Sequence, residues 1–161
     1  MVAPIIITVL AYLHIISAIG WLGGAVLFVS VVAPGLRSLS PTARLEFLSK
    51  IGPKATRFFA GTSTATIVFG LALLFSSDVS GTNINVGLTL GLIAYLVALV
   101  VAFPALTKAD HLAKEALASG QAGPPSPELA KALKRGGLGV VVVVLLLVVT
   151  LMFMVASGFP F

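Results

Sequence analysis

The chain has 161 residues, of which 58% are apolar and 9% are charged, and its mean hydropathy is +1.15. A water-soluble domain of this length needs many more charged residues to cover its surface, so the composition excludes one. The net charge of +5 would favour nucleic acid as the partner of a soluble protein, but membrane topology and contact with anionic lipid headgroups explain it here, and we expect no nucleic-acid binding.

Four stretches without Lys, Arg, Asp or Glu are each long enough to cross a bilayer as a helix, which takes about 20 apolar residues. They are residues 1–36, 58–77, 79–107 and 136–161. We therefore predict an all-α fold, an integral membrane four-helix bundle that forms a single transmembrane domain over residues 1–161. The expected spans are about 4–33, 58–77, 85–106 and 136–158.

The first span is predicted from Pro4 to Ala33, where Pro34 and Gly35 close it. It is longer than the bilayer core requires, so we expect it to tilt or to project at one end. Gly20 and Gly24 form a GxxxG pair, which permits close contact with another helix.

The first connection begins with a helix-start signal, because Ser40 can cap a helix whose first residue is Pro41. Leu45, Leu48 and Ile51 then share one helix face. This pattern fits a short amphipathic helix lying in the membrane interface, and an ordered loop is the alternative. In the second span, the hydroxyls of residues 62–66 are expected to bond back to the helix or across to a neighbour.

The third span carries a second GxxxG pair, Gly87 and Gly91, and we expect Pro104 to kink its exit. Residues 110–118 are predicted to extend this helix into water. Ser126 and Pro127 give another helix start, and the fourth span follows. Its Val-rich sequence would favour a strand in water, but an open strand in lipid leaves backbone groups unpaired, so a helix is expected.

All ten Lys and Arg residues lie in two of the three connections, five in residues 35–57 and five in residues 108–135. Positively charged connections remain in the cytoplasm. We therefore expect both termini to be extracytoplasmic in a multi-pass protein of the cell membrane, with the lipid bilayer as its first partner.

His14 is the most informative single residue. It lies about ten residues, or ~15 Å, into the first span, on the outer side of the midplane. An ionisable group at this depth indicates a functional site, and a neutral imidazole can bind haem iron or copper or relay a proton. The alternative is a structural His14 that bonds to a neighbouring hydroxyl or carbonyl, such as Ser17 or a Thr of the second span.

Trp21 and Met152 are the other candidates. Trp21 lies two turns below His14 on nearly the same face, where it could pack beside a porphyrin or fill space between helices. Met152 and Met154 lie in the outer half of the fourth span, at a depth comparable to that of His14. Their thioethers suit Cu(I) or haem, although packing is the alternative. His14 and Met152 are thus the candidate metal ligands, and His14 and Trp21 the candidate cofactor contacts.

The segment from His14 through Trp21 to Gly24, followed by Pro34, resembles the first helix of membrane proteins of the copper-resistance D family. Arg57, at the start of the second span, fits the same pattern, as does Gly70 within it. This resemblance implies a plasma-membrane protein of copper handling, with His14 and Met152 as ligands.

The same opening is also similar to the HemJ type of protoporphyrinogen oxidase. That resemblance implies that His14 would bind haem and that a Lys in the second span would assist. In this chain Lys54 precedes the second span and no Lys lies within it. The chain also departs from the copper-resistance D family, because it lacks the Met- and His-rich outer surface that is expected of a copper importer.

Three functions are therefore compatible with the sequence: copper homeostasis or transport, haem b-dependent redox chemistry with His14 as axial ligand, and an accessory subunit packed through its GxxxG faces. No catalytic residue is assigned, because the sequence has no Ser-His-Asp set and no acidic metal cluster, and it has no cysteine for a thiolate site. A role other than catalysis is favoured. A haem held by two histidines would require a homodimer, because no span contains a pair of histidines.

Overall fold

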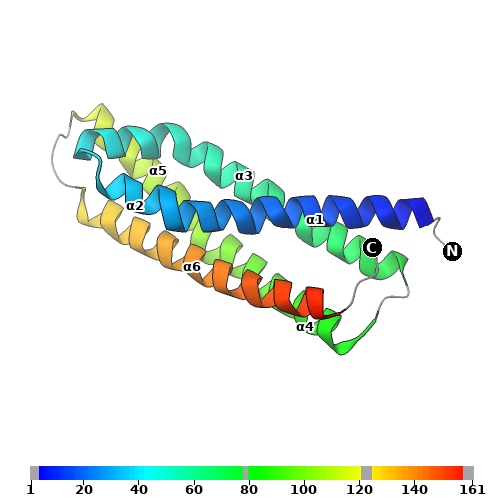
Figure 1. Ribbon diagram of the computed structural model, residues 1–161. Coiled ribbons are helices and arrows are strands. Elements are labelled where there is room, and N and C mark those ends of the chain that lie inside the picture. Colours follow the sequence, from blue (N-terminus) through cyan, green and yellow to red (C-terminus); the bar gives the residue numbers. More distant parts are fainter. Residues whose placement is uncertain (1–3, 78–79, 121–124, 158–161) are drawn as a thin grey trace.

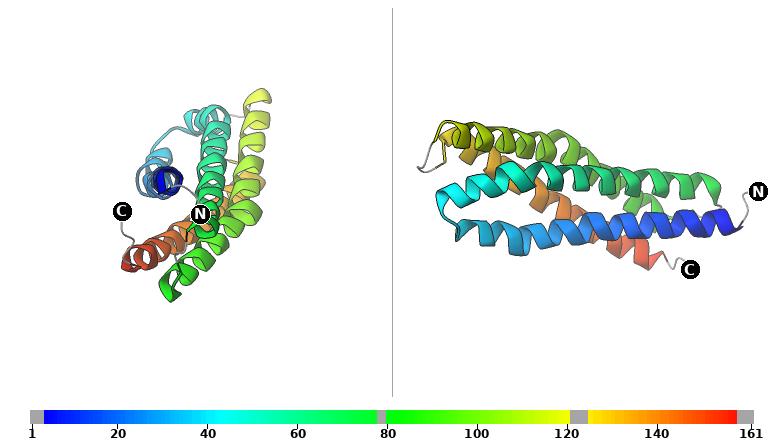
Figure 2. Two further views of the ribbon diagram at one scale, coloured as in Figure 1. Left: turned by 90° about the vertical axis from the view of Figure 1, so that its right-hand side faces the viewer. Right: turned by 90° about the horizontal axis from the view of Figure 1, so that it is seen from above.

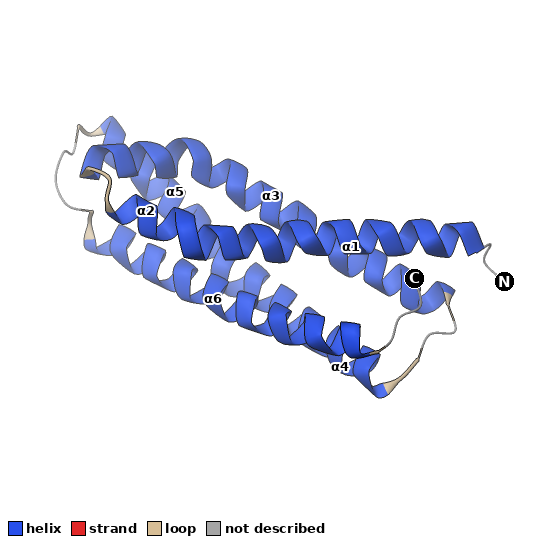
Figure 3. Ribbon diagram, in the orientation of Figure 1, coloured by secondary structure: helices blue, strands red, loops and turns tan. Residues whose placement is uncertain are grey.

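The computed structural model describes residues 4–77, 80–120 and 125–157, which form four long helical rods (Figure 1). Each rod is long and apolar enough to cross a membrane. The described residues contain no strand, as Figure 3 shows. The predicted all-α, four-helix membrane bundle is thereby confirmed. The rods cover Pro4–Arg37, Pro41–Ser76, Thr82–Ala118 and Pro127–Ala156.

Two of the rods are interrupted by a π-helical turn, and the other two are continuous α-helices. The elements in chain order are α1 (Pro4–Leu27), η1 (Phe28–Val32), α2 (Ala33–Arg37), α3 (Pro41–Ser76), α4 (Thr82–Val97), η2 (Ala98–Ala102), α5 (Phe103–Ala118) and α6 (Pro127–Ala156). The first rod therefore consists of α1, η1 and α2, and the third of α4, η2 and α5.

Each π-helical turn ends two residues before a proline, Pro34 in the first rod and Pro104 in the third. A proline has no N–H to donate, and its ring crowds the carbonyl four residues earlier. The wider turn accommodates both effects, since the N–H of Ala33 bonds to the carbonyl of Phe28, five residues back. The first helix thus continues to Arg37 instead of ending at Ala33, which corrects the boundary expected from the sequence.

The first connection is much shorter than the sequence indicated. Ser40 does cap a helix, with its side chain accepting a hydrogen bond from the N–H of Ala43. That helix, however, is α3, which runs without a break into the second span. Neither a separate interfacial helix nor a loop forms here, because Leu45 and Leu48 pack against α5 and α6 instead of against lipid.

At 36 residues, α3 is about 54 Å long, whereas the hydrocarbon core of a bilayer is ~30 Å thick. The surplus forms a three-helix extension, made of the beginning of α3, the end of α5 and the beginning of α6. This extension has its own apolar core. The core consists of Leu45, Leu48, Ala109, Ala113, Leu129 and Ala132.

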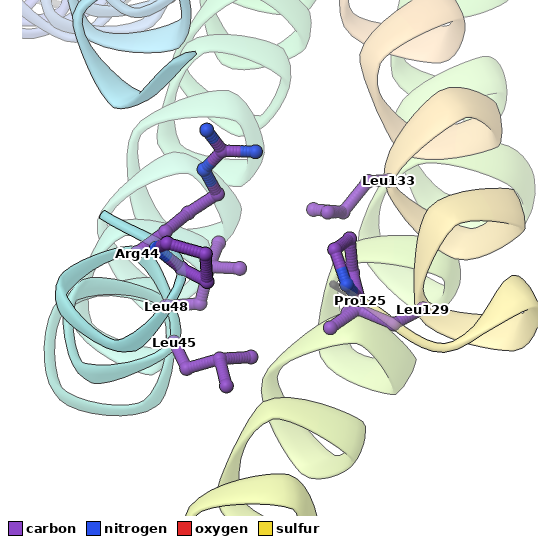
Figure 4. Close-up of a pocket in the computed structure, with 7 residues that line it drawn as sticks. Arg44, Leu45, Leu48, Pro125, Leu129 and Leu133 are labelled. Atoms are coloured by element: carbon purple, nitrogen blue, oxygen red, sulfur yellow. The ribbon is translucent and has the colours of Figure 1, made fainter. Parts of the chain in front are cut away.

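Figure 4 shows how the extension closes, with Leu45 and Leu48 of α3 facing Leu129 and Leu133 of α6. The cavity between them is about 30 Å³, which holds about one water molecule and excludes a larger ligand. Arg44, at its edge, donates hydrogen bonds to the carbonyls that end α2 and start the connection. This guanidinium fixes the turn between the first two rods.

A second core lies within the membrane-spanning part of the bundle. Its buried members come from α1, α4, η2 and α6, and Trp21 is the largest of them. They are Trp21, Ala94, Ala98, Val143 and Leu147.

Glycines set the close helix contacts. α1 runs antiparallel to α3, with which it lies side by side in Figure 2. A Cβ atom at Gly24 would stand only 3.0 Å from the ring of Phe59 on α3. In the other half, a Cβ at Gly87 of α4 would stand 2.9 Å from the methyl group of Met154 on α6. Both GxxxG pairs therefore lie at helix contacts.

The bundle has two chemically different ends (Figure 1). The start of α1, the end of α3, the start of α4 and the end of α6 lie at one end. The turn from α2 to α3, the end of α5 and the start of α6 lie at the other, and all ten Lys and Arg residues belong to the helices that meet there, α2, α3, α5 and α6. We call this the basic end.

Candidate functional site

His14 is held against α3 by a hydrogen bond. Its Nδ1 atom lies 2.8 Å from the backbone carbonyl oxygen of Thr66. A carbonyl oxygen only accepts hydrogen bonds, so Nδ1 must carry the proton and donate it. In the neutral ring, Nε2 is then the nitrogen with a free lone pair, which is the form that binds a metal.

Gly70 provides the space for this ring, one helical turn beyond Thr66. A Cβ atom at position 70 would lie 2.8 Å from Cε1 and 3.0 Å from Nδ1 of His14. Any other residue would therefore collide with the imidazole. In the described part of the chain, Nε2 forms no hydrogen bond with protein, and His14 is only partly buried. This nitrogen is available to a ligand from outside the chain.

The hydrogen bond of His14 agrees in part with a purely structural role for this residue. The sequence suggested a bond to a hydroxyl or carbonyl, for instance in a Thr of the second span, and the partner is indeed in that span. It is the backbone of Thr66, since the hydroxyl of this residue donates to the carbonyl of Thr62. This arrangement satisfies one ring nitrogen and leaves the other free, so it is compatible with a structural role and with ligand binding.

Trp21 is 2% exposed and fills space between helices, in contact with the core that includes Ala94 and Val143. Its ring meets that of Tyr95 edge-on, with centroids 6.3 Å apart. The hydroxyl of Tyr95 in turn lies 2.8 Å from that of Thr64 on α3. A packing role for Trp21 is thus visible, and contact with a cofactor stays a prediction.

The two methionines of α6 lie on opposite faces of the helix. Met154 packs on Gly87 of α4, and Thr150, one turn earlier, lies on the same face near Gly91. Met152 is about 200° around the helix from both, and its side chain is 66% exposed. His14 faces α3, so the described contacts do not bring His14 and Met152 together.

A buried carboxylate in the extension was not found from the sequence. Asp110 of α5 is 5% exposed and its carboxylate touches Gly52 of α3. Burial raises the pKa of Asp110 to about 6, against the opposing effect of the charges of Lys114 and His111. The sequence feature that indicates this contact is Gly52, since a glycine inside an amphipathic helix often marks a close approach of another group.

His111, the second histidine, is exposed at the basic end. It lies on α5 beside Asp110, whereas His14 lies in the other half of the bundle, ten residues from the start of α1. Across residues 4–77, 80–120 and 125–157, no group of three or more His, Cys, Asp or Glu residues could hold a metal ion. The two histidines therefore stand apart, and neither belongs to such a group in the described part of the chain.

A site with one imidazole, that of His14, fits a haem better than a metal ion bound by side chains alone. A haem brings four nitrogen ligands and needs only one or two from the protein, so the free Nε2 of His14 suits it. A metal ion bound by side chains alone needs several ligands around one point. Gly70 adds to the fit, because the ring can approach α3 this closely only where no Cβ stands.

Comparison with known proteins finds no family model, no curated protein and no solved structure that matches this chain. The resemblance of the segment around His14 and Trp21 to copper-resistance D proteins therefore stays a prediction. The function has to be argued from the site itself.

Proposed function

We propose that this multi-pass membrane protein binds haem b, with Nε2 of His14 as an axial ligand. The observation that supports the proposal is the hydrogen bond from Nδ1 of His14 to the carbonyl oxygen of Thr66. In metal-binding histidines, the N–H of the ring nitrogen that does not bind the metal commonly donates a hydrogen bond to a carbonyl or carboxylate, which orients the ring and raises its basicity. When bound, the haem would supply one-electron transfer.

The protein's own contribution would be to hold and orient the ligand. Thr66 fixes the ring tautomer, and Gly70 fixes how closely the ring approaches α3.

The described contacts place no second haem ligand beside His14. His111 is at the basic end, and Met152 is on the exposed face of α6. We propose that a second copy of the chain or a subunit of a larger membrane complex supplies a second axial ligand. The partly exposed position of His14 on the bundle surface supports this arrangement.

We propose the plasma membrane as the location, with the basic end in the cytoplasm. The clustering of all ten Lys and Arg residues at that end supports the orientation. A reporter that is active only outside the cytoplasm, fused after Phe161, should be active. An active cytosolic reporter at the same position would reverse the orientation.

Copper homeostasis is the second candidate, and what supports it is the resemblance of the first helix to the copper-resistance D family. In this case His14 of one copy and Met152 of a second copy would bind Cu(I) between them, because the contacts within one chain do not bring these two residues together. Copper retained in stoichiometric amount by a colourless protein, and reduced by both His14→Ala and Met152→Leu, would favour copper over haem.

The visible spectrum of the protein, purified in detergent from haem-replete cells, tests the haem proposal. We expect a Soret band that is lost in His14→Ala and in His14→Asn. The side-chain amide of the Asn variant stands where Nδ1 stands in His14 and can still donate a hydrogen bond to Thr66, so its loss of haem would reflect loss of the ligand and not of the helix contact. His111→Ala is the matched control and should keep the band. A colourless wild-type protein, or a band unchanged in both His14 variants, would overturn the proposal.

A further inference from the structure

A groove at the basic end of the membrane-spanning part lies outside the His14 site. It has a volume of about 440 Å³ and runs between α6 and the junction of α4 with η2. Three of its lining residues are cations, Lys131, Lys134 and Arg135. The rest of the lining is apolar or glycine, so the groove combines a charged mouth with a hydrocarbon wall.

The sequence of α6 explains this division. Lys131, Arg135, Leu138 and Val142 follow one another at intervals of three or four residues, so they form a single stripe along the helix. Charged residues end at Arg135, and residues 136–157 carry no charge. The stripe therefore passes from the headgroup level into the hydrocarbon level at this point.

The opposite wall comes from Val97 and Val101, one turn apart on α4 and η2. Gly139 brings the two walls together, since a Cβ there would stand 3.2 Å from Cα of Ala102. With this antiparallel register, Val101 lies near the level of Leu138 on α6. Leu138 is 58% exposed and faces the bilayer, so the groove opens to lipid.

The cations at the mouth have no acidic partner in the described structure. The ion pairs found there join Lys50 to Glu46 and Lys108 to Glu128. These three positive charges at the headgroup level can therefore bind an anion from outside the chain without first breaking an ion pair. A phosphodiester supplies such an anion, because Lys binds it as a point charge and Arg as a planar fork.

We propose that this groove is a binding site for one anionic phospholipid. The headgroup phosphate lies among Lys131, Lys134 and Arg135, and a hydrocarbon chain lies along Val97, Val101 and the apolar part of the α6 stripe. The charge of the mouth selects anionic over zwitterionic lipid, and the apolar wall selects a lipid over a free phosphate ion.

Native mass spectrometry of the detergent-solubilised protein tests the site, with phosphatidylglycerol and phosphatidylcholine of identical chains as competing probes. We expect one phosphatidylglycerol to be retained in preference. Combined Lys131→Gln, Lys134→Gln and Arg135→Gln should weaken this retention about tenfold or more. The matched control, Lys50→Gln, Lys54→Gln and Arg57→Gln, removes the same charge from α3 and should leave the preference in place.

Two further experiments distinguish binding of a lipid from binding of a free phosphate ion. Val142→Trp fills the apolar wall and leaves the cations, so it should also reduce retention of phosphatidylglycerol, whereas excess inorganic phosphate should not displace it. If the two lipids are retained equally, if the control triple variant loses as much as the groove variant, or if phosphate displaces the lipid, the proposal is wrong. Single Arg135→Gln provides the same comparison should the triple variant fail to fold.

Discussion

The imidazole of His14 on α1 lies in the space that a side chain at position 70 on α3 would occupy. A Cβ atom at Gly70 would stand 2.8 Å from Cε1 of His14, while Nδ1 of the same ring is fixed by the carbonyl of Thr66. The ring therefore cannot move away from position 70 without lengthening that hydrogen bond. The position of the His14 imidazole therefore depends on glycine at position 70.

The first prediction concerns this pair. Gly70→Ala should displace the imidazole and weaken its hydrogen bond to Thr66, because the three atoms nearest to the new methyl group all belong to this ring. If His14 binds haem, the Soret band should shift or lose intensity while helix content, measured by circular dichroism, stays unchanged. Gly61→Ala on the same helix is the control, since a Cβ there meets nothing within 4 Å. Identical spectra for the two variants would contradict the assigned role of Gly70.

The second prediction concerns Asp110 and Gly52. Gly52→Ala should lower the free energy of unfolding by about 1–3 kcal/mol, because the new methyl group collides with the carboxylate of Asp110. Asp110→Ala removes that carboxylate, so Gly52→Ala should lower the free energy of unfolding much less when Asp110 is already replaced by Ala. A double-mutant cycle of unfolding in mixed micelles measures this coupling. Additive effects of the two substitutions on the free energy of unfolding would show that the collision with Asp110 does not cause the destabilisation by Gly52→Ala.

The third prediction is a pH dependence of stability. Burial raises the pKa of Asp110 to about 6 in the folded protein, from a reference value of 3.8. Between these two values the folded state binds more protons than the unfolded state, so this group makes the protein less stable as the pH rises from about 4 to about 6. The contribution levels off above that range. Asp110→Asn should remove this decline.

Thermal unfolding midpoints in detergent, taken at several pH values, measure the effect. The quantity to compare is the difference between the wild-type protein and Asp110→Asn, because other carboxylates also titrate in this range. Glu115→Gln, an exposed acid on the same helix, is the control and should keep the wild-type slope. A slope unchanged in Asp110→Asn would exclude this carboxylate as its source.

Features governed by local chemistry were predictable from the sequence. The four spans follow from apolar runs, and the caps at Ser40 and Ser126 follow from hydroxyls that accept a backbone N–H three residues later. Both GxxxG pairs were expected at helix contacts and lie there. Each of these features depends on residues close together in the chain.

Features that depend on a distant partner were not predictable in the same way. Leu45 and Leu48 gave an amphipathic pattern, but the pattern does not tell whether the apolar face meets lipid or α6. The partner of His14 is a backbone carbonyl, which every residue of the second span possesses. The approach of Asp110 to Gly52 joins positions 58 residues apart, and although Gly52 signals a close approach of some group, the sequence does not tell which residue approaches.

The fourth prediction compares two glycines of α6. A Cβ at Gly139 would stand 3.2 Å from Cα and 3.3 Å from N of Ala102, whereas a Cβ at Gly137 meets nothing within 4 Å. The atoms opposite Gly139 are backbone atoms and the Cβ of Ala102, none of which can rotate away, so the helices must separate if a methyl group is added there. Gly139→Ala should therefore destabilise the protein by about 1–3 kcal/mol.

Gly137→Ala adds the same methyl group to the same helix two residues away, where it should be neutral or stabilise by up to about 1 kcal/mol through helix propensity. The difference between the two variants, measured by unfolding in mixed micelles, isolates the contact of α6 with η2 from the general effect of replacing glycine. Because Gly139 also forms part of the lipid groove, Gly139→Ala should reduce the preference for phosphatidylglycerol, and Gly137→Ala should not. Equal stabilities of the two variants would mean that Gly139 does not set the separation of these helices.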